Sequence, residues 1–123
     1  MPVEDSKKKD SSLVLARGVA DCLQKRGAAE VVLLDFSGRK EQVADYFVIA
    51  SGGSALQIGS LCEFVLEHIK GFLGRTPPFS EGLSQCRWSI LDYVDVVVHL
   101  FQQELRLYYD LESLWGDAVR IEI

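Results

Sequence analysis

The amino-acid sequence predicts a mixed α/β fold, with one mixed β-sheet of about four or five strands and two main helices. Three observations support this prediction. Short β-branched runs alternate with two segments of helical periodicity, and the last two runs have the pattern of a hairpin. The length of 123 residues suits one domain with a single hydrophobic core.

The composition excludes several classes of function. Apolar residues make up 48% of the chain and the net charge is −5, values typical of a globular protein rather than a disordered one. A negative chain is poorly suited to neutralise phosphates, so we expect no direct DNA binding and a basic protein as the better partner. No apolar run is long enough to span a membrane, which predicts no membrane partner.

Residues 1–10 are polar and include three consecutive lysines, so we expect a flexible, solvated N-terminus. A basic arm for RNA is the alternative. The segment resembles neither a signal peptide nor a transit peptide, which favours the bacterial cytoplasm. The expected organisation is a single domain over 11–118, followed by a C-terminal tail over 119–123.

Two strands should follow the first helix. Ser11 or Ser12 can cap a helix that runs to about Arg26, because leucines and alanines recur there at helical spacing. The runs at 29–36 and 45–51 are short, apolar and bounded by glycine or polar residues, so each predicts a strand.

The longest helix should begin after Ser54 and end near Phe72, with an apolar stripe that packs on a sheet. A right-handed crossover through this helix would make the strand before it parallel to the first strand after it, if those two strands are neighbours. Residues 74–83 contain two prolines and two glycines, which predicts a loop. We expect helical turns within 102–109 and 110–116, and a further strand if 119–123 joins the sheet.

The stretch RWSILDYVDVVVHLF, residues 87–101, predicts a hairpin with Tyr93 and Val94 at its tip and Leu91 paired with Val96. Both faces are apolar. One carries Trp88, Ile90, Val97, His99 and Phe101, and the other carries Ser89, Leu91, Val96, Val98 and Leu100. Two helices cover one face of a sheet, so the second face should be partly open and available to a partner.

The hairpin tip offers candidate binding residues. An aromatic side chain at a tip is difficult to bury, so Tyr93 is predicted to be an exposed anchor of the kind that interfaces use. Asp92 and Asp95 on either side would suit Arg or Lys of a basic partner. The alternative is that both aspartates only stabilise the turn, and for Asp95 the two interpretations have equal weight.

Enzyme chemistry has little support in the sequence. The turn from Ser51 to Ser54 precedes a helix and could cradle a nucleotide phosphate, as nucleotidyltransferases do. It lacks a P-loop lysine and the nearby pair of carboxylates that would hold magnesium. His68 is expected at the surface and His99 within the sheet, while the three cysteines lack metal-ligand spacing. We therefore expect no enzyme activity, no metal site and no cofactor.

Three blocks of the chain resemble one known family, the ribosomal silencing factors, also called Iojap-related proteins. They are DYFVIASGGS at 45–54, WSILDYVDVVVHLF at 88–101 and RLYYDLESLWGDA at 106–118, with Glu81-Gly82 in the loop between the first two. The resemblance implies a nucleotidyltransferase-like fold without catalytic carboxylates. It also implies an adaptor that binds large-subunit ribosomal protein fourteen, blocks association of the two ribosomal subunits and represses translation when nutrients are scarce.

The resemblance further implies a homodimer when the protein is free. The family's contact surface maps onto six residues of this chain: Trp88, Leu91, Asp92, Tyr93, Asp95 and His99. Two positions depart from the family pattern. Val94 stands where glycine is usual, although valine resists the positive φ that tight hairpin turns require. Gln57 stands where histidine is common, so no role of that imidazole carries over.

Overall fold

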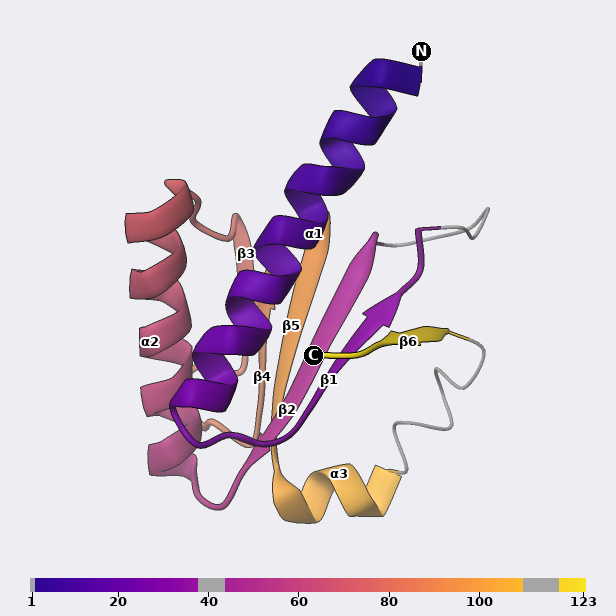
Figure 1. Cartoon of the computed structure of the whole chain (residues 1–123). Helices are drawn as coiled ribbons and strands as arrows, with labels where there is room; N and C mark the ends of the chain where they lie inside the picture. Colours follow the sequence, from indigo (N-terminus) through magenta and orange to yellow (C-terminus); the bar gives the residue numbers. More distant parts are fainter. Residues whose placement is uncertain (1, 38–43, 110–117) are drawn as a thin grey trace.

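The computed structural model describes residues 2–37, 44–109 and 118–123, without the side chains of 2–10 and 107–109. Its backbone forms one mixed sheet with three helices (Figure 1). In chain order the elements are α1 (Pro2–Lys25), β1 (Ala29–Asp35), β2 (Tyr46–Gly52), α2 (Ala55–Leu73), β3 (Phe79–Glu81), β4 (Trp88–Asp92), β5 (Val96–Gln102), α3 (Gln103–Tyr109) and β6 (Val119–Ile121). The turn predicted at 110–116 lies outside the described residues.

The sheet has six strands in the order β3-β4-β5-β2-β1-β6, which is more than the four or five predicted. The additional strand is β3, a three-residue edge strand within the predicted loop, while β6 confirms that the C-terminal segment joins the sheet. Only the pairing of β2 with β5 is parallel among the described strands. The sequence predicted that β2 and the first hairpin strand, β4, are parallel if they are neighbours; they are not neighbours, because β5 lies between them.

Helix α1 begins ten or eleven residues earlier than predicted, at Pro2 instead of after Ser11 or Ser12. Proline suits the first position of a helix because its missing N–H has no helical partner there. Ser12 does not cap the helix. Its side chain is fully buried, and its hydroxyl donates a hydrogen bond to the Asp95 carboxylate at 2.7 Å.

Helix α2 has the ends that the sequence predicts. The Ser54 side chain caps its start by accepting a hydrogen bond from the Gln57 backbone N–H, and Gly74 ends it in the left-handed conformation. The apolar stripe of Ile58, Leu61, Cys62, Val65 and Ile69 is buried against the sheet. No helix in the described part of the chain is long and apolar enough to cross a membrane.

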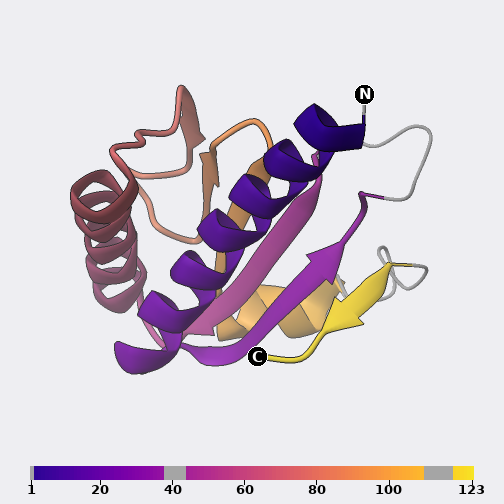
Figure 2. The ribbon, with the colours of Figure 1, turned by 45° about the horizontal axis from the view of Figure 1, so that its top comes forward.

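Helices α1 and α2 cover one face of the sheet, and α3 lies at one end of the strands (Figures 1 and 2). The main core forms between the two long helices and the strands, and includes Leu15, Leu33, Val48 and Leu100. A smaller cluster lies on the opposite face around Ile49 and Phe101. That second cluster covers the central strands and leaves the β3–β4 edge of the same face exposed.

Candidate functional site

The exposed part of the second sheet face is formed by the two strands at one edge. In an antiparallel pair, directly opposite residues place their side chains on the same face. Phe79 of β3 pairs with Asp92 of β4, and Glu81 of β3 pairs with Ile90 of β4. We use the name β4 face for the surface that these residues and their strand neighbour share: Phe79, Glu81, Trp88, Ile90 and Asp92.

The β4 face combines apolar and acidic side chains. Phe79 is 64% exposed and Trp88 is 37% exposed, while Ile90 and Asp92 are half-buried. Glu81 is also exposed. Exposed aromatic side chains are enriched in surfaces that bind proteins, because the rings contribute buried area, and carboxylates around them select a basic partner.

His99 of β5 contacts the Trp88 ring and accepts a hydrogen bond from it. The Trp88 Nε1–H donates a hydrogen bond to His99 Nδ1 at 3.2 Å, and the Trp88 and Phe101 ring centroids lie 4.7 Å apart. Burial lowers the pKa of His99 to about 4, so its imidazole is neutral near pH 7 and Nδ1 can act as an acceptor. His99 is only 6% exposed. It therefore positions the Trp88 ring and has little exposed surface of its own.

The hairpin confirms the predicted faces but not the predicted register. Leu91 pairs with Val98 instead of Val96, so the pairing is shifted by two residues. A shift of two keeps every side chain on its face, because side chains alternate with a period of two. The extra residues form the turn, in which the Asp92 carboxylate accepts a hydrogen bond from the Val94 N–H at 2.8 Å. Val94 has φ 81°, a conformation that valine rarely adopts.

Tyr93 is not an exposed anchor, so that prediction is wrong. Its side chain is fully buried and belongs to the main core beneath the helices. The chain turns at Val94, which directs Tyr93 inward and leaves Val94 as the exposed residue of the tip. Burial raises the pKa of the Tyr93 phenol to about 12, and its hydroxyl has no hydrogen-bond partner among the described residues.

Asp95 is engaged within the chain. Arg75, in the segment after α2, donates two hydrogen bonds to its carboxylate, at 3.0 and 2.7 Å, and a third to the Tyr93 carbonyl. Burial alone would raise the pKa of Asp95, but the bonds from Arg75 and Ser12 outweigh it and hold the pKa below its ordinary value. Of the two interpretations of Asp95, the structure favours the one in which it stabilises the turn.

The six residues predicted for the site therefore separate into three places. Trp88, Asp92 and His99 lie on the second sheet face, Leu91 and Tyr93 lie in the main core, and Asp95 lies in the ion pair beside the turn. Leu91 is fully buried, so it cannot contact a partner in this conformation.

Sequence reasoning missed Phe79 and Glu81 as members of the surface. The two prolines at 77–78 predicted a loop, and a three-residue strand is too short to show periodicity. The signal that could have found them is the alternation of Phe79 and Glu81 around Ser80, directly after the prolines. Ile90 was assigned to the correct face but not to the site.

The Ser51–Ser54 turn uses its own polar groups internally. The Gly53 N–H donates to the Gln57 side-chain oxygen at 2.7 Å, and the Gln57 N–H donates to the Ser54 hydroxyl. Ser51 is fully buried and its hydroxyl accepts a hydrogen bond from Arg106. Two of the amides at this helix start, those of Gly53 and Gln57, are therefore already bonded within the chain, which argues against a nucleotide site.

The thiols and acids form no metal centre in the part of the chain that the structure describes. No group of three or more His, Cys, Asp or Glu side chains there could hold an ion. Cys22 and Cys62 are buried free thiols, and burial raises the pKa of Cys62 to about 11. A thiol with a raised pKa is a poor nucleophile, because the thiolate is the reactive form.

Comparison with known proteins gives a consistent result. Residues 9–123 match the family model described as "Ribosomal silencing factor during starvation". A ribosomal silencing factor of Zymomonas mobilis is 35% identical over 120 residues, which is 94% of this chain and 89% of that protein. A ribosomal silencing factor of Bacillus subtilis is 38% identical over 105 residues, which is 85% of this chain and 86% of that protein.

Solved structures of similar proteins have the same fold. A crystal structure of a Bacillus halodurans protein aligns with a TM-score of 0.73 and 32% identity, covering 93% of this chain and 99% of that one. A crystal structure of a Chromobacterium violaceum protein aligns with a TM-score of 0.77 and 28% identity, covering 85% of each chain. The names of these relatives describe silencing of the ribosome.

Proposed function

The chain belongs to the family of ribosomal silencing factors, and from that premise we propose how it acts on the ribosome. It binds the large subunit through large-subunit ribosomal protein fourteen and prevents the small subunit from joining. Translation is thereby repressed when nutrients are scarce. The protein works as a steric block and not as an enzyme, in the bacterial cytoplasm where the subunits meet.

The observation that supports this proposal is the β4 face. Its aromatic side chains, Phe79 and Trp88, are exposed on a sheet face where the described helices leave them uncovered. The carboxylates of Glu81 and Asp92 lie on the same face. A partner that covers this surface must contribute apolar contacts and basic groups, and both are expected of a protein that is embedded among ribosomal RNA phosphates.

The contact residues of the proposal follow from their exposure. Trp88 and Asp92 remain from the residues that the family resemblance suggested, and Phe79, Glu81 and Ile90 are added. His99 acts indirectly by holding the Trp88 ring. Val94 is 58% exposed at the tip and extends the same edge of the surface.

Binding to purified large subunits tests the proposal. Two isosteric variants show whether the carboxylates of the β4 face contribute to that binding. Asp92→Asn removes a charge but keeps an oxygen that can accept from the Val94 N–H, so the turn is preserved. Glu81→Gln removes a second charge from an exposed side chain. The double variant should bind about tenfold or more weakly, with a smaller dependence on salt.

Glu63→Gln is the matched control, because Glu63 is an exposed glutamate of α2 on the helical side of the sheet. It should leave binding unchanged. Lack of binding by the unmutated protein, or equal losses in the control and in the β4-face variants, would contradict the proposal. A subunit-joining assay then checks whether the bound protein keeps the small subunit away.

Two further properties belong to the same proposal. The fold is nucleotidyltransferase-like and lacks catalytic carboxylates, which agrees with the internally bonded Ser51–Ser54 turn. The free protein forms a homodimer, which sedimentation at several protein concentrations checks. If the protein sediments as a monomer at every concentration, the dimer proposal is wrong, whereas the proposal of ribosome binding is unaffected.

A further inference from the structure

The border of the sheet at β6 lies opposite the border that carries the β4 face. Strands β3 and β6 are the two ends of the sheet, so among the described strands β6 has a neighbour on one side only (Figure 2). Glu122 and Ile123 continue the chain beyond β6. We use the name β6 edge for the segment 119–123. Unlike β3, it does not follow prolines, and each of its residues has a backbone N–H.

One face of the β6 edge is apolar. Ile121 pairs with Leu33 of β1 and packs against the main core, so it lies on the face that α1 and α2 cover. Alternation along the strand places Val119 and Ile123 on the same face, and Ile123 lines a hollow with residues of α1. Val119 is 65% exposed and Ile123 is 45% exposed. This row therefore has apolar surface left uncovered by the described residues.

The other face of the β6 edge carries two opposite charges. Arg120 pairs with Leu34, which belongs to the cluster on the second sheet face. Glu122 lies on the same side by alternation. Both side chains are exposed, and neither forms an ion pair with another described residue. Within the described part of the chain, both charges are therefore available to a partner.

The backbone of the β6 edge directs polar groups outward. In an antiparallel sheet, successive residues turn their N–H and C=O groups to opposite sides of the strand. The Phe36 N–H donates to the Asp45 carbonyl, so along this part of the chain even-numbered residues face β2 and odd-numbered residues of β1 face β6. Ile121 pairs with an odd-numbered residue and turns its groups towards it. The groups of Arg120 and Glu122 are therefore directed to the open side.

We propose that the β6 edge pairs with the β6 edge of a second copy of this chain, in an antiparallel register centred on Ile121. In that register Arg120 lies opposite Glu122 of the partner subunit, and Val119 lies opposite Ile123 of the partner subunit. The Glu122 carbonyl accepts a bond from Arg17 at 3.5 Å and keeps a second lone pair for the pairing. The inference rests on the homodimer of the proposed function and names its interface.

The charges select this register among those that keep the two faces aligned. A centre at Arg120 would place two arginines opposite each other, and a centre at Glu122 would place two glutamates opposite each other. Like charges directly opposite destabilise a strand pair, whereas the centre at Ile121 gives two Arg–Glu pairs by symmetry. The β6 edge is therefore complementary to itself.

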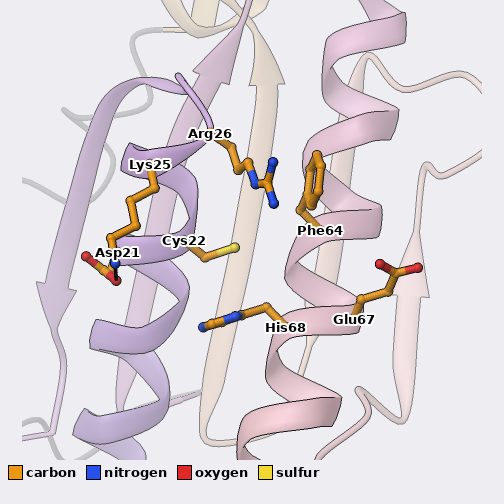
Figure 3. Close-up of a pocket in the computed structure, with 7 residues that line it drawn as sticks. All are labelled: Asp21, Cys22, Lys25, Arg26, Phe64, Glu67 and His68. Carbon is orange, nitrogen blue, oxygen red and sulfur yellow. Dashed lines mark ion pairs between the residues drawn. The ribbon is translucent and has the colours of Figure 1, made fainter.

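The hollow between α1 and α2 shows no such order (Figure 3). It is lined by the acids Asp21 and Glu67 as well as by the bases Lys25 and Arg26. Charges of both signs around one hollow do not select a partner by its charge. At the β6 edge, in contrast, the two charges follow one another along a single strand, so their order specifies the direction and the register of a partner strand.

A dimer through the β6 edge leaves the β4 face of each copy open, because the two surfaces belong to opposite borders of the sheet. Each copy can therefore still bind a large subunit. The pairing segment has five residues in each copy, which buries less area than a permanent dimer does. We expect a dimer that dissociates on dilution.

Charge reversal tests the interface by sedimentation at several protein concentrations. Arg120→Glu should weaken the dimer about tenfold, because it places two glutamates opposite each other in both pairs. Glu122→Arg should weaken it to a similar extent, and the double variant should restore it. Arg87→Glu is the matched control, because it makes the same charge change at an exposed arginine beside β4. Equal weakening in this control, or no recovery in the double variant, overturns the inference.

The same measurements separate this inference from the proposed function. A dimer that neither single reversal weakens forms through another surface, so this inference alone is wrong. A monomer at every concentration overturns this inference together with the homodimer. Binding of Arg120→Glu to purified large subunits should equal that of the unmutated protein, and a loss there would show that the β6 edge contacts the ribosome instead of a second copy.

Cysteine cross-linking gives an independent measurement. Ile121→Cys would place two thiols directly opposite each other in a pair whose Cα atoms are about 4.5 Å apart, which suits a disulfide. Mild oxidation should convert this variant to a covalent dimer. Val119→Cys is the control, because its counterpart in the second copy lies farther along the strand, and the unmutated protein shows the background from the native cysteines. Equal cross-linking in all three proteins overturns the inference.

Discussion

The Arg75 guanidinium holds the Asp95 carboxylate with two hydrogen bonds, although the residues are 20 positions apart in the sequence. Ser12 adds a bond to the same carboxylate, and the Asp95 carbonyl accepts from the Asp45 and Tyr46 N–H groups. This cluster joins α1, the start of β2, the hairpin turn and the segment after α2. The turn that carries Asp92 is therefore fixed by contacts from distant parts of the chain.

Arg75→Leu should lower the free energy of unfolding by about 1–2 kcal/mol, because it leaves a partly buried carboxylate without its main donor. Solvent reduces the loss, since the Arg75 side chain is 34% exposed. Urea denaturation measures the change. Arg87→Leu is the control, and an equal loss there would show that the ion pair contributes nothing specific.

Val94→Gly should raise the free energy of unfolding by about 1 kcal/mol. Valine at φ 81° is strained, whereas glycine adopts this conformation freely. Val94→Asn should give a smaller gain and Val94→Ala the smallest, because the order follows tolerance of positive φ. Thermal denaturation of the series measures these changes in stability. A loss of stability in the glycine variant would contradict the claim that Val94 is strained.

Tyr93→Phe should leave stability unchanged or raise it by up to about 1 kcal/mol, because the buried hydroxyl has no partner among the described residues. Tyr93→Ala should instead cost about 3–5 kcal/mol by leaving a cavity in the main core. Calorimetry compares the two. A loss of more than about 1 kcal/mol in the phenylalanine variant would show that the hydroxyl is bonded.

The stability of the protein should fall as the pH drops from about 6.5 towards 4, because His99 has a folded pKa of about 4, below the ordinary value of an unfolded histidine. The neutral form is the one that the fold accepts, so its contribution is complete above pH 6.5. Each pH unit in this window costs up to about 1.4 kcal/mol.

His99→Gln should flatten this slope in urea titrations between pH 4 and 6.5. His68→Gln should leave it unchanged, since His68 is exposed on α2. If both variants keep the slope of the unmutated protein, groups other than His99 are responsible.

Gly82→Ala should disrupt the close packing of the Gly82 backbone against the Trp88 backbone at the start of β4. A Cβ at this position would lie 2.1 Å from the Trp88 carbonyl oxygen, and Gly82 has φ 73°. We expect a loss of at least about 2 kcal/mol together with weaker binding to the large subunit. Gly71→Ala is the control, because a Cβ there has nothing within 4 Å. Equal stability of the two variants would contradict this view of Gly82.

Local sequence patterns predicted the elements whose signal is local. The periodicity of α2 with its Ser54 cap, and the β-branched runs of β1, β2, β4 and β5, are properties of neighbouring residues. The direction of Tyr93 could not be predicted in this way, because it depends on the conformation of Val94 and on helices that are distant in the sequence. The same limit applies to Asp95, whose partner Arg75 is in a loop without a motif.

The edge strand β3 has a consequence for solubility. Exposed rings on the last strand of a sheet are a common cause of aggregation, because another chain can extend the backbone hydrogen bonding there. Here the strand is only three residues long and follows Pro77 and Pro78, which have no N–H to donate. The exposed ring of Phe79 therefore lies on a strand that offers a neighbouring chain too little backbone to extend the sheet.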